Sequence, residues 1–207
     1  MGKKWRRLIG AFVIIVLGFT VWEFYKSREA QKLIDEIKEE RSSDIVFGDI
    51  KAKNNVIIFF DYNCGFCNKF MAEVYPRLKE TVLKNSDAKI TLRLVCRTTD
   101  VKATEAYQTA ICLNQAGDYM KLHKLLMHKP EVVYTEYFNQ IKEDYIVSND
   151  ILAECIMTSE NQDIKHNIYQ FQQLKTKGTP TFVVGTKVIK GLKGAETFKN
   201  IIESEFN

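Results

Sequence analysis

The feature that most constrains the fold is a pair of cysteines placed between a strand-like segment and a helical pattern. Cys64 and Cys67 (CGFC) follow residues 55–61 (NVIIFFD), a continuous run of apolar residues that is typical of a buried central strand. After the first cysteine, apolar residues recur every fourth position, at Phe66, Phe70, Val74 and Leu78. Residues 89–96 (KITLRLVC) then alternate like a second strand. The sequence therefore predicts a βαβ unit with the two cysteines at the turn that enters its helix.

The remainder of the chain completes an α/β pattern. Residues 101–176 show helical periodicity throughout, and Gly178 is suited to ending the last of these helices. Residues 181–185 and 187–190 are typical of a hairpin, and residues 195–206 of an amphipathic helix. We expect an α/β fold over residues 44–207, with a helical subdomain inserted at about 101–176.

The N-terminus carries an uncharged apolar run at residues 8–22, directly after the cationic stretch KKWRR. The run is short for a bilayer core about 30 Å thick, but Trp5, Trp22 and Tyr25 flank it like an aromatic belt. We expect residues 1–25 to form an uncleaved signal anchor, with a cleaved signal peptide as the alternative.

Charge supports a membrane topology and not a nucleic-acid surface. The net charge is +4, and Lys3, Lys4, Arg6 and Arg7 lie before the apolar run, so the rest of the chain is nearly neutral. Flanking cations stay in the cytoplasm, which sends the following residues across the membrane, to the side that is oxidising in bacteria. The expected location is the bacterial inner membrane with the domain in the periplasm, or the periplasm itself after cleavage.

Residues 26–43 are polar, with Ala30, Leu33, Ile34 and Ile37 on one helical stripe. Two interpretations stay open for this segment. It is either a helical spacer that separates the domain from the membrane or a short oligomerisation helix, which would make the protein a homo-oligomer.

The spacing of Cys64 and Cys67 suits thiol–disulfide exchange. At a helix start, unpaired N–H groups and the positive end of the dipole favour a thiolate, and the second sulfur lies one turn further, within disulfide reach. One thiol can attack a disulfide while the other resolves the mixed intermediate. The competing use is half of a zinc or copper site, but a zinc site needs two further ligands and the chain has no second CxxC. No metal ligand is therefore assigned.

Gly178-Thr179-Pro180-Thr181 stands immediately before an expected strand, where a proline is tolerated. FFDYNCGFC near the start of the domain and GTPTFVVG near its end together resemble the DsbA-like branch of the thioredoxin superfamily, over about residues 45–207. The resemblance implies a thioredoxin fold and a thiol–disulfide oxidoreductase. Cys64 would be the exposed nucleophile, Cys67 the resolving thiol, and Thr179-Pro180 the cis-proline loop that pairs with an extended client chain.

The same resemblance implies which cofactor and partners the catalytic cycle would need. No organic cofactor is needed, because the redox-active disulfide is the Cys64–Cys67 pair itself. The partners would be unfolded or wrongly oxidised client proteins and a membrane protein that resets the pair. Nucleic acid is not among the expected partners.

Three departures from the family pattern bear on this activity. Strongly oxidising members carry Pro-His inside the motif, whereas this chain has Gly65-Phe66, so we expect a weaker oxidant. This pair, with Thr before the proline, is more similar to isomerases and to oligomeric relatives linked to copper tolerance. Where many relatives have a buried Glu this chain has Ile58, and Asp61, the nearest acid, either tunes Cys67 or caps the turn.

The other cysteines are Cys96, Cys112 and Cys155. Cys112 and Cys155 lie on apolar helical faces of the expected insertion and would form a structural disulfide in an oxidising compartment. Cys96 would then be a buried free thiol at a strand end, although other pairings stay open.

The leading hypothesis is an extracytoplasmic enzyme that forms or rearranges disulfides through Cys64 and Cys67. The alternatives are an oligomeric isomerase or reductase, a copper- or zinc-binding envelope protein that uses the CxxC thiolates, and a non-catalytic envelope protein that keeps the fold for binding.

Overall fold

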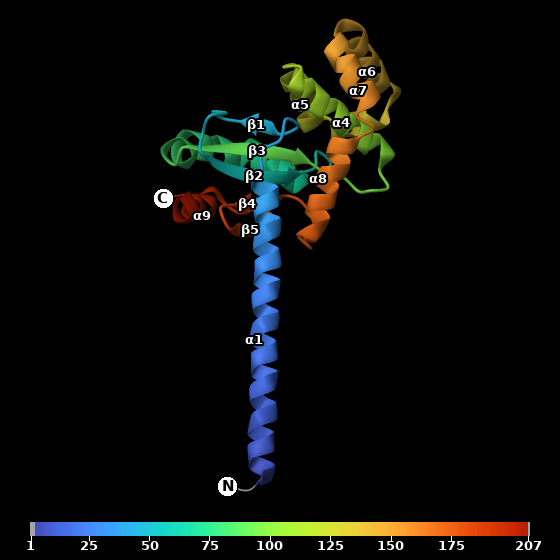
Figure 1. The fold of residues 1–207 in the computed structure, drawn as a ribbon. Helices are drawn as coiled ribbons and strands as arrows, with labels where there is room; N and C mark the ends of the chain where they lie inside the picture. The colour runs from blue at the N-terminus through green and yellow to red at the C-terminus, as the bar shows by residue number, and fades with distance from the viewer. Residues whose placement is uncertain (1–2, 207) are drawn as a thin grey trace. The chain divides into compact units, whose positions relative to one another are not determined.

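The computed structural model describes the backbone of residues 3–206 and the side chains of residues 12–206. The chain divides into two compact units, Met1–Ile37 and Lys38–Asn207. The second unit holds the whole sheet and all the helices after the first (Figure 1).

A single helix, α1, runs without interruption from Lys3 to Lys38. It therefore crosses the expected boundary between the anchor and the polar segment at residue 25. The apolar side chains from Phe12 to Tyr25 are exposed. Over the part of the chain that the structure describes, no helix is both long enough and apolar enough to cross a membrane. The expected anchor begins in residues 8–11, whose side chains lie outside the described part.

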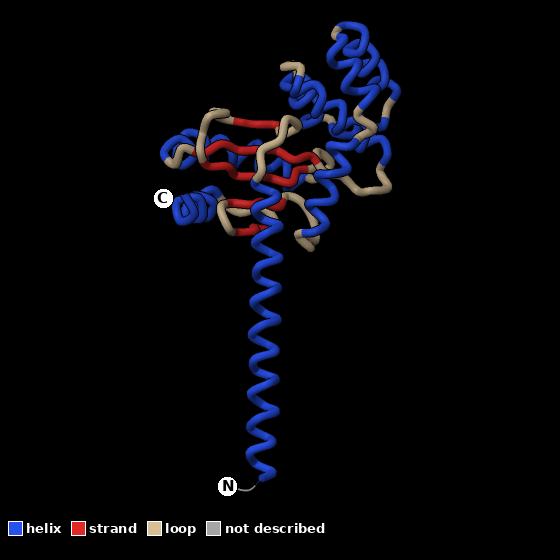
Figure 2. The backbone as a smooth tube through the Cα atoms, in the orientation of Figure 1, coloured by secondary structure: helices blue, strands red, loops and turns tan. Residues whose placement is uncertain are grey.

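The sheet of the second unit has the strand order β1-β3-β2-β4-β5 within the described residues (Figure 2). Strand β2 pairs in parallel with β3 on one side and antiparallel with β4 on the other. Strand β1 pairs antiparallel with β3, and β5 pairs antiparallel with β4. The strands are β1 (Ile45–Phe47), β2 (Asn54–Phe60), β3 (Ala88–Leu94), β4 (Thr181–Val184) and β5 (Lys187–Lys190). The predicted α/β fold, with a parallel pair around the CxxC helix and a C-terminal hairpin, is confirmed.

Helices cover both faces of this sheet. On one face an aromatic cluster joins the helical run after Cys64 to β4 and to α9 (Ala195–Phe206). The ring centroids of Phe182 and Phe198 are 4.5 Å apart, and those of Phe70 and Phe182 are 5.0 Å apart. On the other face α8 (Gln162–Gln173) packs against the sheet, with Phe171 5.6 Å from Phe59. Burial of these rings drives the layers together.

The helical run after Cys64 alternates α-helical and π-helical turns. It consists of α2 (Gly65–Lys69), the π turn η1 (Phe70–Val74), α3 (Tyr75–Leu78) and the π turn η2 (Lys79–Leu83). The predicted apolar stripe is wrong at its first member, because Phe66 is 65% exposed and Cys67 takes the inward position one turn before Phe70. The buried face therefore starts at the second cysteine.

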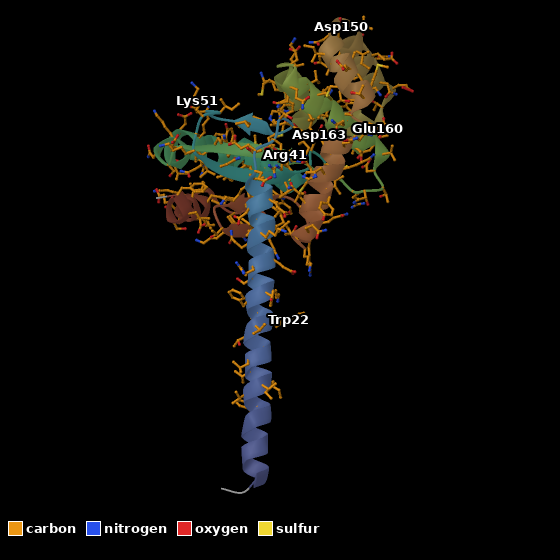
Figure 3. All side chains as sticks on the ribbon, in the orientation of Figure 1. Trp22, Arg41, Lys51, Asp150, Glu160 and Asp163 are labelled. Carbon is orange, nitrogen blue, oxygen red and sulfur yellow. A yellow bond between two sulfur atoms is a disulfide. The ribbon has the colours of Figure 1, made fainter. Side chains whose placement is uncertain are left out.

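A buried ion pair connects the segment before β1 to the centre of the sheet. The Arg93 guanidinium donates to Asp44 at 2.8 Å and to Gln170 of α8 at 3.0 Å. Arg41 donates to Asp44 at 3.4 Å and to Asn167 of α8 at 2.5 Å (Arg41 is labelled in Figure 3). These bonds satisfy charges that burial would otherwise penalise, and they fix α8 relative to β3.

Between β3 and β4 the chain forms the helical block α4–α8, as predicted. Figure 1 shows α6 and α7 side by side and remote from the sheet, and each buries little, with Phe138 and Leu152 as their fully buried residues. A disulfide between Cys112 and Cys155 joins α4 to α7. Besides α8, the elements of this block are α4 (Val101–Gln115), α5 (Tyr119–His128), the 3₁₀ turn η3 (Pro130–Tyr134), α6 (Glu136–Ser148) and α7 (Asp150–Thr158).

Side-chain hydrogen bonds hold this block together and attach it to the sheet. Gln108 of α4 donates to Asp163 of α8 at 2.9 Å (Asp163 is labelled in Figure 3). The hydroxyl of Tyr62, which lies between β2 and the CxxC, bonds to the hydroxyl of Tyr119 and to His123 Nδ1, the latter at 2.8 Å. All three side chains of this cluster are buried. The loop that leads into the CxxC is therefore connected directly to α5.

Candidate active site

Cys64 occupies the last extended position before α2, with φ −95° and ψ 111°. Its N–H donates to the Asp61 carbonyl at 3.0 Å, and its own carbonyl accepts from the N–H groups of Cys67 at 2.9 Å and Asn68 at 3.1 Å. The turn therefore fixes both cysteines to the end of β2. Cys64 is half-buried and Cys67 is fully buried, and both are free thiols in this structure.

Thr179 contacts both sulfur atoms. Cys64 Sγ donates to the Thr179 carbonyl oxygen at 3.1 Å, and the Thr179 side chain hydrogen-bonds to the Cys67 sulfur. The Thr179–Pro180 peptide bond is cis. The Pro180 carbonyl accepts from the Gly191 N–H at 2.9 Å, which holds the loop against the end of β5.

The two cysteines differ in environment. Burial raises the pKa of the Cys67 thiol far above its ordinary value. Hydrogen bonds from the Asp61 backbone and the Thr179 side chain oppose this shift without cancelling it. A reduced Cys67 is therefore held as a protonated thiol, while Cys64 has the access that a nucleophile needs.

Asp61 caps the turn that leads into the CxxC, which is one of the two roles that the sequence left open. Its Oδ1 accepts from the Asn63 N–H at 2.9 Å, which caps the turn, and from the Tyr107 hydroxyl at 2.6 Å. Its backbone hydrogen-bonds to Cys67. Burial raises the pKa of the Asp61 carboxyl, and the bond from Tyr107 partly opposes that rise.

The two residues between the cysteines face outward. The Phe66 side chain, two positions after Cys64, is exposed, and a Cβ added at Gly65 would meet open space. An exposed aromatic ring next to a reactive thiol offers an apolar contact for an approaching chain.

A pocket of about 740 Å³ opens beside Cys64 and Thr179. Its walls come from the end of β2, the loop after β3, η3, α8 and the loop before β4. Several of its residues had no role in the sequence analysis: Asn63, Arg97, Asp100, Tyr134 and Lys177. All of these except Asn63 lie outside the two motifs. They come together only because the helical block places η3 and α8 next to the CxxC loop.

Cys96 also lines this pocket. It is a free thiol at the end of β3 but only half-buried, so the expectation of full burial is wrong. Its sulfur lies 3.3 Å from the Thr104 hydroxyl, and burial raises its pKa to about 11. Such a thiol is a poor nucleophile at neutral pH.

No group of three or more His, Cys, Asp or Glu side chains is placed to hold a metal ion within the described residues. His123 Nδ1 is hydrogen-bonded to the hydroxyls of Tyr62 and Tyr119, and burial lowers the pKa of His123 to about 4. The sulfur atoms of Cys64 and Cys67 therefore have no third ligand of these kinds beside them in the described part of the chain.

Comparison with known proteins agrees with this architecture. A family model described as thioredoxin matches residues 40–204. The chain belongs to the thioredoxin family. No curated protein matches it. The predicted membership of the thioredoxin superfamily is thereby confirmed.

Solved structures show the same fold at low sequence identity. A linker-deletion mutant of Proteus mirabilis ScsC is 18% identical, with a TM-score of 0.67 over 99% of this chain and 96% of that one. A periplasmic thioredoxin-like protein from Salmonella enterica is 18% identical, with a TM-score of 0.59 over 84% and 96%. Wolbachia pipientis α-DsbA1 is 19% identical, with a TM-score of 0.61 over 83% and 94%.

Proposed function

We propose that this thioredoxin-family chain works outside the cytoplasm, where it forms or rearranges disulfide bonds in translocated client proteins. The observation that carries the proposal is the contact of Thr179 with both sulfurs, one accessible and one buried. This arrangement would leave Cys64 open to an incoming client sulfur and would shield Cys67 from the client.

In the forming direction the oxidised Cys64–Cys67 pair accepts two electrons. A client thiolate attacks Cys64 Sγ, the Cys64–Cys67 bond breaks, and Cys67 leaves and takes up a proton. A second client thiolate then attacks the client sulfur of the mixed disulfide. The client disulfide forms, and Cys64 leaves as a thiolate.

In the rearranging direction the reduced pair starts the cycle. The Cys64 thiolate attacks one sulfur of a wrong client disulfide and releases the other as a client thiolate. A different client thiolate then attacks the client sulfur of the mixed disulfide, so that a new client disulfide forms and Cys64 leaves as a thiolate. If the client does not resolve the intermediate, Cys67 loses its proton and attacks Cys64 Sγ. The bond between Cys64 and the client breaks, the client sulfur leaves as a thiolate, and the intramolecular disulfide is restored with the client reduced. The raised pKa of Cys67 delays this escape step.

The loop at Thr179-Pro180 is the proposed client-binding edge. Its backbone lies against Cys64, and β4 continues from it. An extended client segment can add to this edge through main-chain hydrogen bonds that do not depend on client sequence. The exposed Phe66 side chain would add an apolar contact.

Location and re-oxidation are part of the proposal. The cations before residue 8 and the apolar side chains of residues 12–25 support an N-terminal segment held in the membrane, with the domain on the oxidising side. A membrane protein would then reset the pair. Labelling of Cys64 in intact cells by a membrane-impermeant maleimide tests this placement, and labelling only after lysis would contradict it.

The decisive experiment for the activity is to trap clients. In Cys67→Ser the attacking thiol remains and the resolving thiol is gone, so mixed disulfides should accumulate and disappear on reduction. Cys64→Ser is the matched control and should trap nothing. If neither variant traps a client and the reduced protein instead binds one equivalent of zinc or copper, the metal-binding alternative is correct.

A refolding assay separates the two directions. Reduced ribonuclease reports formation, scrambled ribonuclease reports rearrangement, and the mass of the full chain in detergent reports its oligomeric state. Oligomers that unscramble ribonuclease would assign the isomerase direction and give residues 26–43 the oligomerisation role.

A further inference from the structure

The pocket beside Cys64 lies where it can contact client side chains close to the reacting client cysteine. Cys64 and Thr179 lie on its wall, so a segment seated at the Thr179 edge passes its mouth. A side chain one or two positions from the reacting client cysteine can therefore enter it. The lining of the pocket then decides which side chains are accepted.

The cations of the pocket are available to a ligand. Arg97, in the loop after β3, and Lys177, in the loop before β4, both line it and are both exposed. Among the residues that the structure describes, neither takes part in an ion pair.

The carboxylates of the pocket are occupied by the protein itself. Asp61 accepts from Tyr107 and from the Asn63 N–H. Asp100 accepts from the Tyr134 hydroxyl at 2.7 Å and from the Ala103 N–H at 3.0 Å. The charge of Arg97 only weakly stabilises the Asp61 carboxylate, and burial, the larger effect, raises its pKa. The two carboxylates thus use their oxygens within the protein, and Arg97 and Lys177 are the charged groups of the pocket whose side chains make no such bond among the described residues.

The remaining lining suits a short apolar stem. Val95, Ile168 and Phe171 contribute apolar surface to the same pocket. A glutamate side chain has methylene groups that can pack against them and a carboxylate to offer to the two cations, whereas a lysine would bring like charge to both.

We propose that this pocket selects client segments that carry an acidic side chain next to the reacting cysteine, with Arg97 and Lys177 as the specificity-determining residues. The inference rests on the proposed function, because it concerns the clients of the same exchange reaction. The client thiolate still attacks Cys64 Sγ and Cys67 still leaves. The charge contact therefore changes how readily the client binds and leaves the exchange reaction itself unchanged.

The test uses the oxidised full chain in detergent and three two-cysteine peptides. They differ only beside the first cysteine, which is flanked by Glu, Gln or Lys, and peptide oxidation is followed by mass. We expect kcat/KM for the Glu peptide to exceed that for the Gln peptide roughly fivefold, as two exposed ion pairs allow. The Lys peptide should be slowest. The preference should shrink at high salt, because screening weakens exposed pairs.

The double variant Arg97→Ala/Lys177→Ala should lose the preference for Glu over Gln. Its rate with the Gln peptide serves as an internal reference for any general change in Cys64 reactivity. The matched control is Lys51→Ala, since Lys51 is an exposed lysine before the start of β2, at the opposite end of that strand from Cys64 (Figure 3). It should keep the full preference.

Each outcome is decisive for one proposal. Equal rates for the three peptides, or a preference that survives in the double variant, would overturn the selection of acidic clients and leave the oxidoreductase proposal intact. Failure to oxidise any peptide would overturn the forming direction itself.

Discussion

The carbonyl oxygen of Thr179 lies 3.1 Å from Cys64 Sγ, although the two residues are 115 positions apart in the sequence. The side chain of the same threonine bonds to Cys67. One residue therefore touches both members of the redox pair, through its backbone on one side and its hydroxyl on the other.

Thr179→Val separates these two contacts, because it keeps the carbonyl and removes the hydroxyl. The hydroxyl stabilises the reduced Cys67 sulfur, so its loss disfavours the reduced pair. We expect a reduction potential about 10–30 mV more negative, corresponding to one ordinary hydrogen bond. The potential is measured by equilibration with glutathione. Thr176→Val, which alters a neighbouring threonine of the same loop, should leave it unchanged, and an equal shift there would contradict the assignment.

Phe66→His tests the origin of the oxidising strength. A histidine at this exposed position in the first turn of α2 brings a polar, partly cationic group near the Cys64 thiolate and stabilises the reduced form. The reduction potential of the wild-type pair should lie well below the roughly −120 mV of the strongest oxidases. In the variant the potential should be tens of millivolts higher than in wild type. A wild-type value near −120 mV would refute the weaker-oxidant prediction. Phe66→Leu controls for loss of the ring.

Removing the Cys112–Cys155 bridge should destabilise the domain without changing the active pair. The bridge spans 43 positions and fastens α7, which buries little else. In Cys112→Ala/Cys155→Ala we expect the free energy of unfolding to fall by about 2–4 kcal/mol, measured with urea. The Cys64–Cys67 potential should stay constant. If the bridge is absent from the purified protein, the double variant will unfold like wild type.

His123 makes the fold sensitive to acid. Its folded-state pKa is lowered to about 4 by burial, so the unfolded chain binds the proton more tightly. Its stabilising contribution is complete above its ordinary value near 6.5 and is lost as pH falls toward 4. The loss is on the order of 3 kcal/mol. His123→Gln should flatten this part of the stability curve, whereas His128→Gln should not. Equal curves for wild type and His123→Gln would be the contrary result.

The sequence predicted the fold best where a single segment has a composition or motif that is specific to one structure. Residues 55–61 are apolar enough to require a central strand, and the CxxC and Gly-Thr-Pro segments mark both sides of the redox site. The three-residue strand β1 has no alternation that could reveal it. The apolar stripe misassigned Phe66, because Cys67 takes the inward position one turn before Phe70.

The pocket could not be predicted by the same means. Arg97, Tyr134 and Lys177 lie in segments with no motif, and they meet only after α8 is fixed to β3 by Arg93 and its partners. Their proximity is a property of tertiary packing, in which residues far apart in sequence become neighbours. The sequence shows that these residues are cationic or aromatic, but it does not show that they lie close together.

The order of the strands also has a consequence for biosynthesis. Strand β4 must add to the edge of β2, which was made long before it, and β5 then pairs with β4. A nascent chain that ends before residue 176 already exposes both cysteines of the pair but lacks Thr179. Until the C-terminal segment emerges, the protein is itself a substrate-like chain with reactive thiols, and it becomes an enzyme only when its own C-terminal hairpin closes the site.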